Sequence, residues 1–215
     1  MPLGTCLNRY CHRLRAYISL CYCRFQLKRR LSASNIFRKY TMRPATSEIP
    51  QKASEIMDAA ERRIRTSGYN GFSFREIATD VGVKSSSVHH HFRTKPALAA
   101  AVARRYTDRF EAALAKAKSA EDWRAVFRKA LVEDGQMCLC GVLGAESGDL
   151  PAEVSAEARR FFRRSLKALG QLYGPPSAAS RQSALRVMAM LEGAMMLART
   201  LDDPSVFEEA TRNLP

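Results

Sequence analysis

The stretch SFREIATDVGVKSSSVHHHFRTK, beginning at Ser73, constrains the fold most because it carries start and stop signals for two short helices. Ser73 and Glu76 have the S-x-x-E spacing of a capping box, and Gly82 is placed as a C-terminal stop. A second short helix is expected from about 85 to 92, and Thr94 is placed to cap a longer one. Helices this short are unstable alone, so they must pack on a neighbouring helix.

An apolar stripe upstream supplies that neighbour, and Gly68 ends the helix that carries it. The stripe recurs at the i, i+3, i+4 spacing of one buried helical face, at Ala53, Ile56, Met57, Ala60 and Ile64. Three helices with a glycine-containing turn between the second and third form a helix-turn-helix unit. Packing of the third helix on the first leaves one of its faces free.

The charge of the chain, +14 in total, is unevenly distributed. Residues 1–41 contain nine Lys or Arg and no acid, residues 43–110 contain twelve against seven acids, and residues 111–215 contain fourteen of each. A basic folded half beside a neutral half indicates a polyanionic partner for the first half. A basic face that serves only solubility is the alternative.

The first 41 residues differ from the rest, because they are rich in Arg and Cys and show no sustained period. Basic residues interrupt the apolar stretch, so a secretory signal is a poor interpretation. We interpret residues 1–47 as a disordered or mispredicted extension, with Met42 as the natural start. The cysteine spacing there fits no standard zinc pattern. No run of 18 apolar residues occurs, so no membrane span is expected.

The stretch from Ser73 to Leu98 resembles the N-terminal helix-turn-helix of TetR/AcrR-family transcriptional regulators. The matching positions are Arg75, Ile77, Ala78, Gly82, Val83, Val88, His90, Phe92, Lys95 and Leu98. The resemblance covers about residues 48–215, with specific motifs only in 53–98. It implies a DNA-binding homodimer, joined through the last two long helices as a four-helix bundle, with an effector pocket in the body.

The fold class that follows is all-α, with an N-terminal three-helix DNA-binding domain over residues 48–96. Residues 97–215 are expected to form a helical effector-binding and dimerisation domain, whose last long helix runs from about 180 to 201. The expected function is that of a cytoplasmic, ligand-responsive regulator. We expect a repressor that a small molecule of unknown identity releases from a palindromic operator. No enzymatic activity, cofactor, metal or membrane partner is expected.

The third helix is expected to enter the major groove of double-stranded DNA by its N-terminal part. Short side chains there allow close approach to base edges, and a lysine reaches guanine or a phosphate. The residues assigned to this contact are Lys84, Ser85, Ser86 and Ser87. Lys95, at the start of the next helix, is expected at a phosphate, as are Ser73 and Arg75, although each is also an ordinary solvated residue near a helix end.

Three of the four histidines are consecutive, at His89, His90 and His91. Successive helical residues point about 100° apart, so these three side chains do not converge on one metal ion. The resemblance implies phosphate-contacting aromatic side chains at His89 and His91 and a more structural His90. An imidazole gains a proton near neutral pH, so the affinity for DNA is expected to depend on pH there.

The body offers candidate effector-binding residues, each of which is equally plausible as core. They are Trp123, Phe127, Met137, Cys138, Phe161, Met188 and Glu192. Glu192 is unusual, because it is an acid within an apolar helical stripe. An alternative function is redox or electrophile sensing through Cys138 and Cys140, which requires a lowered thiol pKa. An enzyme or metal protein built on His and Cys, and a sequence-independent DNA binder, are further rivals.

Overall fold

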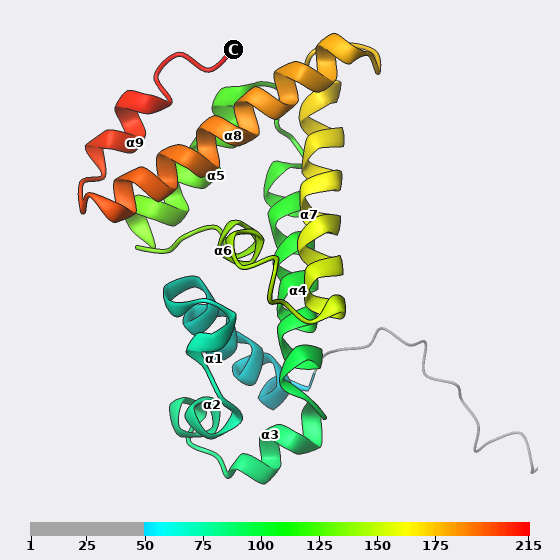
Figure 1. Ribbon diagram of the computed structural model, residues 1–215, viewed down its shortest axis with the longest axis vertical. Coiled ribbons are helices and arrows are strands. Elements are labelled where there is room, and N and C mark those ends of the chain that lie inside the picture. The colour runs from blue at the N-terminus through cyan, green and yellow to red at the C-terminus, as the bar shows by residue number, and fades with distance from the viewer. Residues whose placement is uncertain (1–49) are drawn as a thin grey trace, which may run out of the picture. The chain divides into compact units, whose positions relative to one another are not determined.

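The structure is a computed structural model that describes residues 50–215 of the chain; the predicted extension over 1–47 and the start at Met42 lie outside the described residues. Every regular element in this part is a helix (Figure 1). The α-helices are α1 Gln51–Ser67, α2 Phe74–Val81, α3 Ser85–His91, α4 Lys95–Leu114, α5 Ala120–Arg128, α6 Leu139–Ala145, α7 Ala152–Gln171, α8 Ala178–Thr200 and α9 Ser205–Ala210. A 3-10 turn, η1, spans Tyr69–Gly71, and a π-helical turn, η2, spans Lys129–Glu133. None of these helices has the length and apolar content to cross a membrane.

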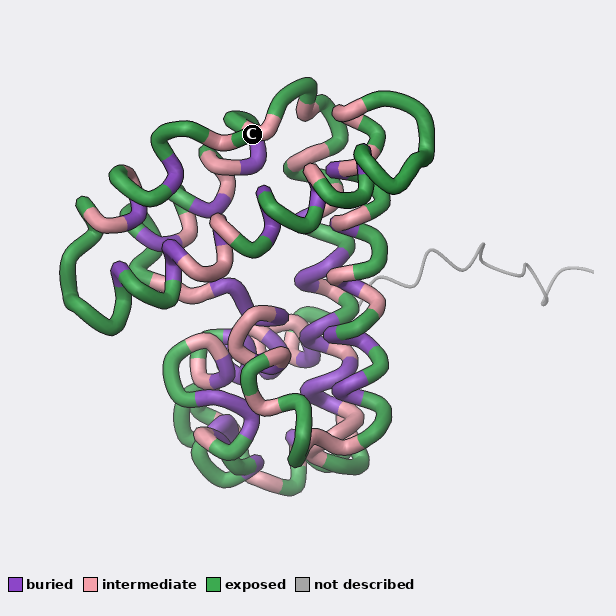
Figure 2. Tube along the Cα trace, turned by 45° about the horizontal axis from the view of Figure 1, so that its top comes forward, coloured by how far each residue is buried: buried purple, intermediate pink, exposed green. Residues whose placement is uncertain are grey.

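Helices α1 to α3, called the reader below, pack around one apolar core together with the start of α4. The side chains that fill this core are fully buried and come from all four helices: Ile56, Ile64, Ile77, Val88 and Leu98. Buried positions lie on the facing sides of the helices and exposed positions on the outside (Figure 2). The prediction that the two short helices pack on the α1 stripe is confirmed.

The boundaries of α2 to α4 follow the sequence signals. The Ser73 hydroxyl accepts a hydrogen bond from the Glu76 N–H at 3.3 Å, and Gly82 ends α2 in the left-handed conformation with φ of 68°. The Glu76 carboxylate accepts from the Ser73 hydroxyl and pairs with Arg63, so only the serine half of the expected capping box is made among the described bonds. The Thr94 hydroxyl accepts from the Ala97 N–H at 3.2 Å.

Helices α4 to α9 form the body. Its core is aromatic: the ring of Phe110 lies 5.0 Å from that of Phe161, 5.6 Å from Trp123 and 5.7 Å from Phe127, measured between centroids and in edge-on arrangements. Helices α4 and α7 are also joined by the buried Glu157 of α7, which pairs with the exposed Arg104 of α4 at 2.6 Å. The α4 helix runs from the reader into the body, so a change at either end acts on one continuous element.

Two elements of the body were not expected from the sequence. Helix α9 contributes the fully buried Phe207, and the π-helical η2 continues α5 by one turn. Helix α8 runs from Ala178 to Thr200 rather than from about 180 to 201, because Ser177 and Ser180 form a reciprocal capping box.

Candidate nucleic-acid interface and pocket

The N-terminal part of α3 presents short polar side chains away from the core. Lys84 occupies the N-cap and is exposed, and Ser86 is exposed in the first turn, with Ser85 and Ser87 partly buried beside it. Val88 faces inward and is fully buried, so it sets which face of α3 is turned toward the core. Among the described residues, helix α3 lies at the end of the molecule opposite the C-terminus (Figure 1). Its free surface is therefore open to a large partner.

The three histidines point in different directions. His89 is exposed, but its ring lies edge-on to Phe74 of α2 at 4.7 Å between centroids. His90 is exposed, whereas His91 is partly buried, so the expectation that His90 is the more structural one does not fit the structure. Within residues 50–215 no group of three or more His, Cys, Asp or Glu side chains is arranged to hold a metal ion.

The charges around α3 leave the reader surface positive. Both acids of α2, Glu76 and Asp80, are neutralised by Arg63 of α1, and its hydrogen bond, 2.5 Å from Nε to Asp80, lowers the pKa of that carboxyl. Arg75, Lys84 and Arg93 are exposed, and none forms an ion pair with any residue in the range 50–215. Unpaired cations on an exposed surface favour contact with phosphates.

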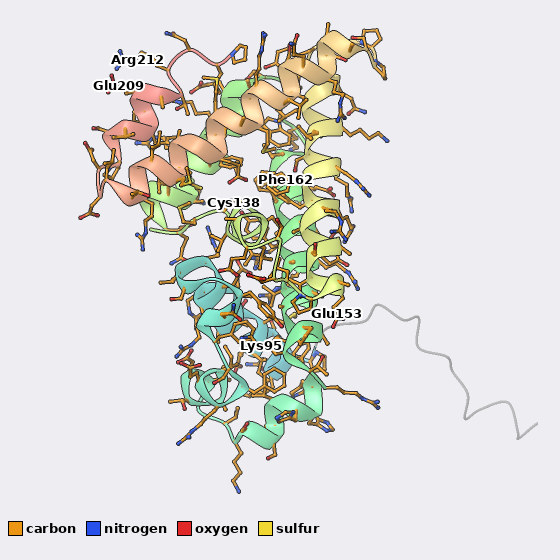
Figure 3. The ribbon with its side chains drawn as sticks, in the orientation of Figure 1. Lys95, Cys138, Glu153, Phe162, Glu209 and Arg212 are labelled. Atoms are coloured by element: carbon orange, nitrogen blue, oxygen red, sulfur yellow. The ribbon has the colours of Figure 1, made fainter. Side chains whose placement is uncertain are left out.

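Lys95 has a structural contact that the sequence did not reveal. Its Nζ lies 4.6 Å from the ring centroid of Tyr69 and 4.6 Å from that of Phe72, and desolvation lowers its pKa. The cation therefore joins the start of α4 to the turn between α1 and α2 (Figure 3). Any contact of Lys95 with a phosphate adds to this role.

Helix α6 is bound to the reader at both ends. Before the helix, the Met137 carbonyl accepts from Arg65 Nε at 2.5 Å; after it, Glu146 Oε2 accepts from the Tyr69 N–H at 2.8 Å. Gly68 makes room for the second contact, because a Cβ there would lie 1.7 Å from Glu146 Oε1, and its φ of 76° also favours glycine. Sequence reasoning missed Arg65 and Glu146, since only Gly68 carries a local signal.

The same α6 segment forms one wall of a pocket of about 690 Å³, whose other walls come from α7 and α8. The lining residues are mostly apolar: Met137, Gly141, Val142, Gly144, Ala145, Glu146, Phe162, Leu166, Leu185, Met188, Ala189, Glu192, Gly193 and Met196. The volume falls in the range of about 300–1,000 Å³ typical of small-molecule sites. The two charged lining residues are both acids.

Among the residues that line this pocket, Glu192 is the one with a buried polar atom that lacks a hydrogen-bond partner in the described part of the chain. Its Oε1 is shielded from solvent and has no hydrogen-bond partner among the described residues. Its Oε2 faces α6, where a Cβ on Gly141 would lie only 2.3 Å away. Burial raises the pKa of this carboxyl to about 7.

The other predicted effector residues are divided between pocket and core. Met137 and Met188 line the pocket with Glu192, whereas Phe127 and Phe161 are almost fully buried in the aromatic core. Trp123 is also buried and borders a separate pocket of about 340 Å³ between α4, α5 and α7. These three aromatic residues thus have the core contacts that the sequence allowed as the alternative.

Both body cysteines are buried, and Figure 3 shows Cys138 at the start of α6. The Cys138 sulfur accepts from the Gly141 N–H at 3.4 Å, as the cap of α6. Burial, and next the nearby Glu192 carboxylate, raise the pKa of both thiols. The thiolate is the reactive form, so this environment disfavours redox or electrophile sensing by Cys138 and Cys140.

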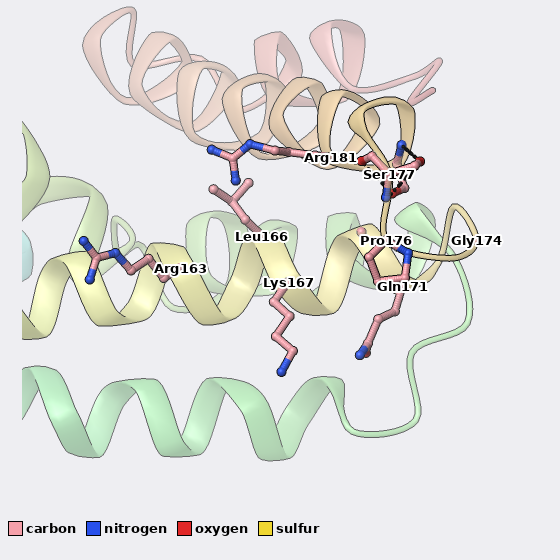
Figure 4. A pocket seen from close by; sticks show the side chains of 10 residues that line it. Arg163, Leu166, Lys167, Gln171, Gly174, Pro176, Ser177 and Arg181 are labelled. Carbon is pink, nitrogen blue, oxygen red and sulfur yellow. Dashed lines mark hydrogen bonds between the residues drawn. The ribbon is translucent and has the colours of Figure 1, made fainter.

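A further pocket, of about 470 Å³, lies where α7 turns into α8 (Figure 4). Its charged lining residues, Arg163, Lys167 and Arg181, are all basic. Leu166 lines both this pocket and the one beside α6, so two cavities of opposite charge are neighbours on the same helix pair.

Comparisons with known proteins agree with this geometry. Residues 56–102 match the model of the family described as bacterial regulatory proteins, tetR family. A TetR-family transcriptional regulator from Agrobacterium tumefaciens is similar in structure, with a TM-score of 0.70 and 28% identity over 75% of this chain and 94% of that chain. A TetR transcriptional regulator from Legionella pneumophila is similar with a TM-score of 0.69 and 28% identity, over 76% of this chain and 95% of that chain. The reduced form of E. coli NemR shares the fold at 21% identity and a TM-score of 0.62, over 74% and 92%.

A comparison with curated proteins gave no match. Residues 56–102 thus carry the DNA-binding motif of the tetR family, and the described residues have the all-helical fold of TetR-family transcriptional regulators.

Proposed function

We propose that the protein is a repressor that binds a palindromic operator as a homodimer and releases it when a small molecule occupies the pocket beside α6. The observation that carries this proposal is the position of α6, which lines the pocket and is hydrogen-bonded to the reader at both ends. A ligand that moves α6 therefore acts directly on the part of the molecule that carries α3.

The reader contacts proposed for DNA follow from exposure and charge. Lys84 and Ser86 are the most exposed groups at the tip of α3, so they are placed to meet base edges, with Ser85 and Ser87 beside them. Arg75 and Arg93 are exposed, unpaired cations for the flanking phosphates. We retain Ser73, Lys95 and the three histidines as backbone contacts.

The proposed dimer surface lies on α8 and the adjoining face of α7. Four large apolar side chains are exposed on or just after α8: Leu185, Met196, Leu197 and Leu201. A Cβ on Gly193 would meet nothing within 4 Å, so a second copy of the chain can approach the helix closely there, whereas Ala194 is buried in the core of its own chain. Since Leu185 and Met196 also line the α6 pocket, the second copy would close its open side.

The coupling between pocket and reader requires that the ligand bind two states unequally. In the state described here, Glu146 is both a pocket wall and the acceptor for the Tyr69 N–H. A ligand that draws Glu146 or Met137 away from the reader favours a different orientation of α1 to α3. The spacing of two readers then no longer matches the operator, and the affinity falls.

Nuclease footprinting of the DNA upstream of the gene, with purified protein, tests this function. We expect protection of one short palindrome, and a logarithmic affinity that falls by about 0.9 per phosphate contact per tenfold increase in salt concentration. Uniform protection of all fragments would instead indicate a sequence-independent DNA binder. Replacement of Cys138 and Cys140 by Ser should leave the ligand response intact; its loss would favour thiol sensing.

A further inference from the structure

The charges of the α6 pocket contrast with those of the chain as a whole. The chain carries a net charge of +14, yet the charged side chains that line this pocket are Glu146 and Glu192, and the lining contains no Lys or Arg. Glu146 already accepts from the Tyr69 N–H. Glu192 Oε1 is shielded and has no partner among the described residues, so the fold leaves one acceptor inside an apolar cavity unsatisfied.

We propose that this pocket binds an amphipathic organic cation, an amine or quaternary ammonium with a hydrophobic body, whose charge pairs with Glu192. The proposal rests on the proposed function, since it names the chemical class of the effector.

The walls around Glu192 fit the hydrophobic body of such a molecule. Phe162, Leu166, Met188 and Met196 line the cavity from α7 and α8. Methionine side chains adapt to ligands of irregular shape, and an aromatic ring attracts a cation. The ring of Phe162 packs closely on α6 at Gly144, where an added Cβ would lie only 3.3 Å from the ring.

Other ligand classes fit this lining less well. An anion would have to be buried near two carboxylates, without a cation in the lining to compensate it. A neutral ligand with a hydroxyl or amide group can donate a hydrogen bond to Glu192 Oε1, but it leaves the charge of the buried carboxylate uncompensated. A cation satisfies the carboxylate in its charged form and adds Coulomb attraction in a site of low dielectric constant.

The pKa of Glu192 gives this proposal a second readout. At pH values below about 7 the buried carboxyl is protonated and a cation must displace its proton, so affinity for a permanent cation should rise as the pH increases from 6 to 8. The titratable groups near Glu192 on α6 and its two caps are Cys138, Cys140 and Glu146; the α7 residues that line the pocket contribute none. Both thiols have raised pKa values and stay neutral in this range.

The test is isothermal titration of the full-length protein, without DNA, with three probes of equal chain length: octyltrimethylammonium, octanol and octanoate. We expect the cation to bind at least tenfold more tightly than octanol, and octanoate to bind most weakly. In Glu192→Gln the preference for the cation and its pH dependence should disappear, while the affinity for octanol stays the same. Glu192→Asp, which keeps the charge, should retain part of the preference.

Equal or tighter binding of octanol or octanoate by the wild-type protein, or no binding of any probe, overturns the inference. Thermal unfolding of each variant shows that it is folded. DNA binding in the presence of each probe separates the two proposals. If octanoate or octanol releases the operator and the cation does not, the repressor function stands and the cation assignment fails. If the cation binds through Glu192 without releasing the operator, the binding site stands and the proposed function fails.

Discussion

The reader and the α6 pocket use charge in opposite ways. In the reader, Arg63 neutralises both acids of α2, while Arg75, Lys84 and Arg93 stay exposed and unpaired within the described chain. In the pocket an acid, Glu192, lies among apolar side chains, and its Oε1 has no hydrogen-bond partner among the described residues. Each surface is therefore complementary to a ligand of opposite charge, a polyanion in one case and a small cation in the other. The two ligands that we propose are thereby directed to different surfaces of the chain.

The largest effect that we predict is a loss of stability, and it distinguishes a core residue from a pocket residue. Phe161 is fully buried among Phe110 and Phe162, so Phe161→Ala should lower the free energy of unfolding by about 3–5 kcal/mol. The neighbouring Phe162 is partly buried and lines the pocket, so Phe162→Ala should cost about 1–2 kcal/mol and change ligand affinity instead. Urea unfolding and probe titration of both variants measure this. Equal stability losses would show that the boundary between core and pocket is misplaced.

The next effect tests the connection between the two regions. Gly68 and Gly82 both have positive φ, but only Gly68 lies against Glu146. Gly82→Ala should cost about 1–2 kcal/mol for the left-handed backbone alone. Gly68→Ala should cost about 3 kcal/mol, because it also displaces the carboxylate that holds the Tyr69 N–H. The stability of each variant is read from chemical unfolding.

A double mutant makes this test specific. Glu146→Ala removes the clash, so the losses for Gly68→Ala and Glu146→Ala should be less than additive. Glu146→Ala with Gly82→Ala is the matched control, and its losses should add. Additive losses in both pairs would mean that Glu146 does not connect the body to the reader.

These two regions also show what sequence reasoning can reach. The reader was predictable because its signals are local: Ser73, Gly82 and Thr94 set helix ends within four residues of their partners. The contact between Tyr69 and Glu146 spans 77 positions, and no local sequence pattern around either residue predicts it. Glu192 was recognisable from the sequence as an acid in an apolar stripe. Whether its Oε1 finds a partner among the described residues depends on α6, more than 45 positions earlier.

The same limit applies to the aromatic residues of the body. A stripe containing Trp123, Phe127 or Phe161 looks the same whether it faces a ligand or another helix. Only the packing of α4, α5 and α7 shows that these rings contact Phe110. Helix α9 was not predicted, because a six-residue helix is stabilised by burial of one side chain, Phe207, rather than by its intrinsic helix propensity.

A smaller effect concerns the titration of Glu192 in the protein without ligand. A carboxyl whose pKa is raised from 4.5 to about 7 on folding binds its proton more tightly in the folded state, so its contribution is favourable at low pH and is lost as the pH rises through 7. Relative to Glu192→Gln, the wild type should lose on the order of 2 kcal/mol of stability between pH 5 and 8. Glu209→Gln, at an exposed position on α9, is the control: it keeps Glu192, so its stability should fall with rising pH in parallel with that of the wild type. Parallel stability curves for wild type and Glu192→Gln would contradict the burial of this carboxyl.

The smallest effect concerns base recognition by the tip of α3. Lys84 is exposed at the N-cap and makes no ion pair within residues 50–215, so its removal should hardly change stability. If it contacts a base edge, Lys84→Ala should weaken binding to the preferred operator by about 1 kcal/mol and relax the preference at one base pair in each half-site. Arg93→Ala, which removes a cation proposed to contact a phosphate, should instead weaken binding to all sequences alike and reduce the salt dependence. Competition assays with single-base operator variants distinguish the two patterns. A uniform loss in Lys84→Ala would place this side chain at the DNA backbone and leave sequence reading to the three serines and the shape of the operator.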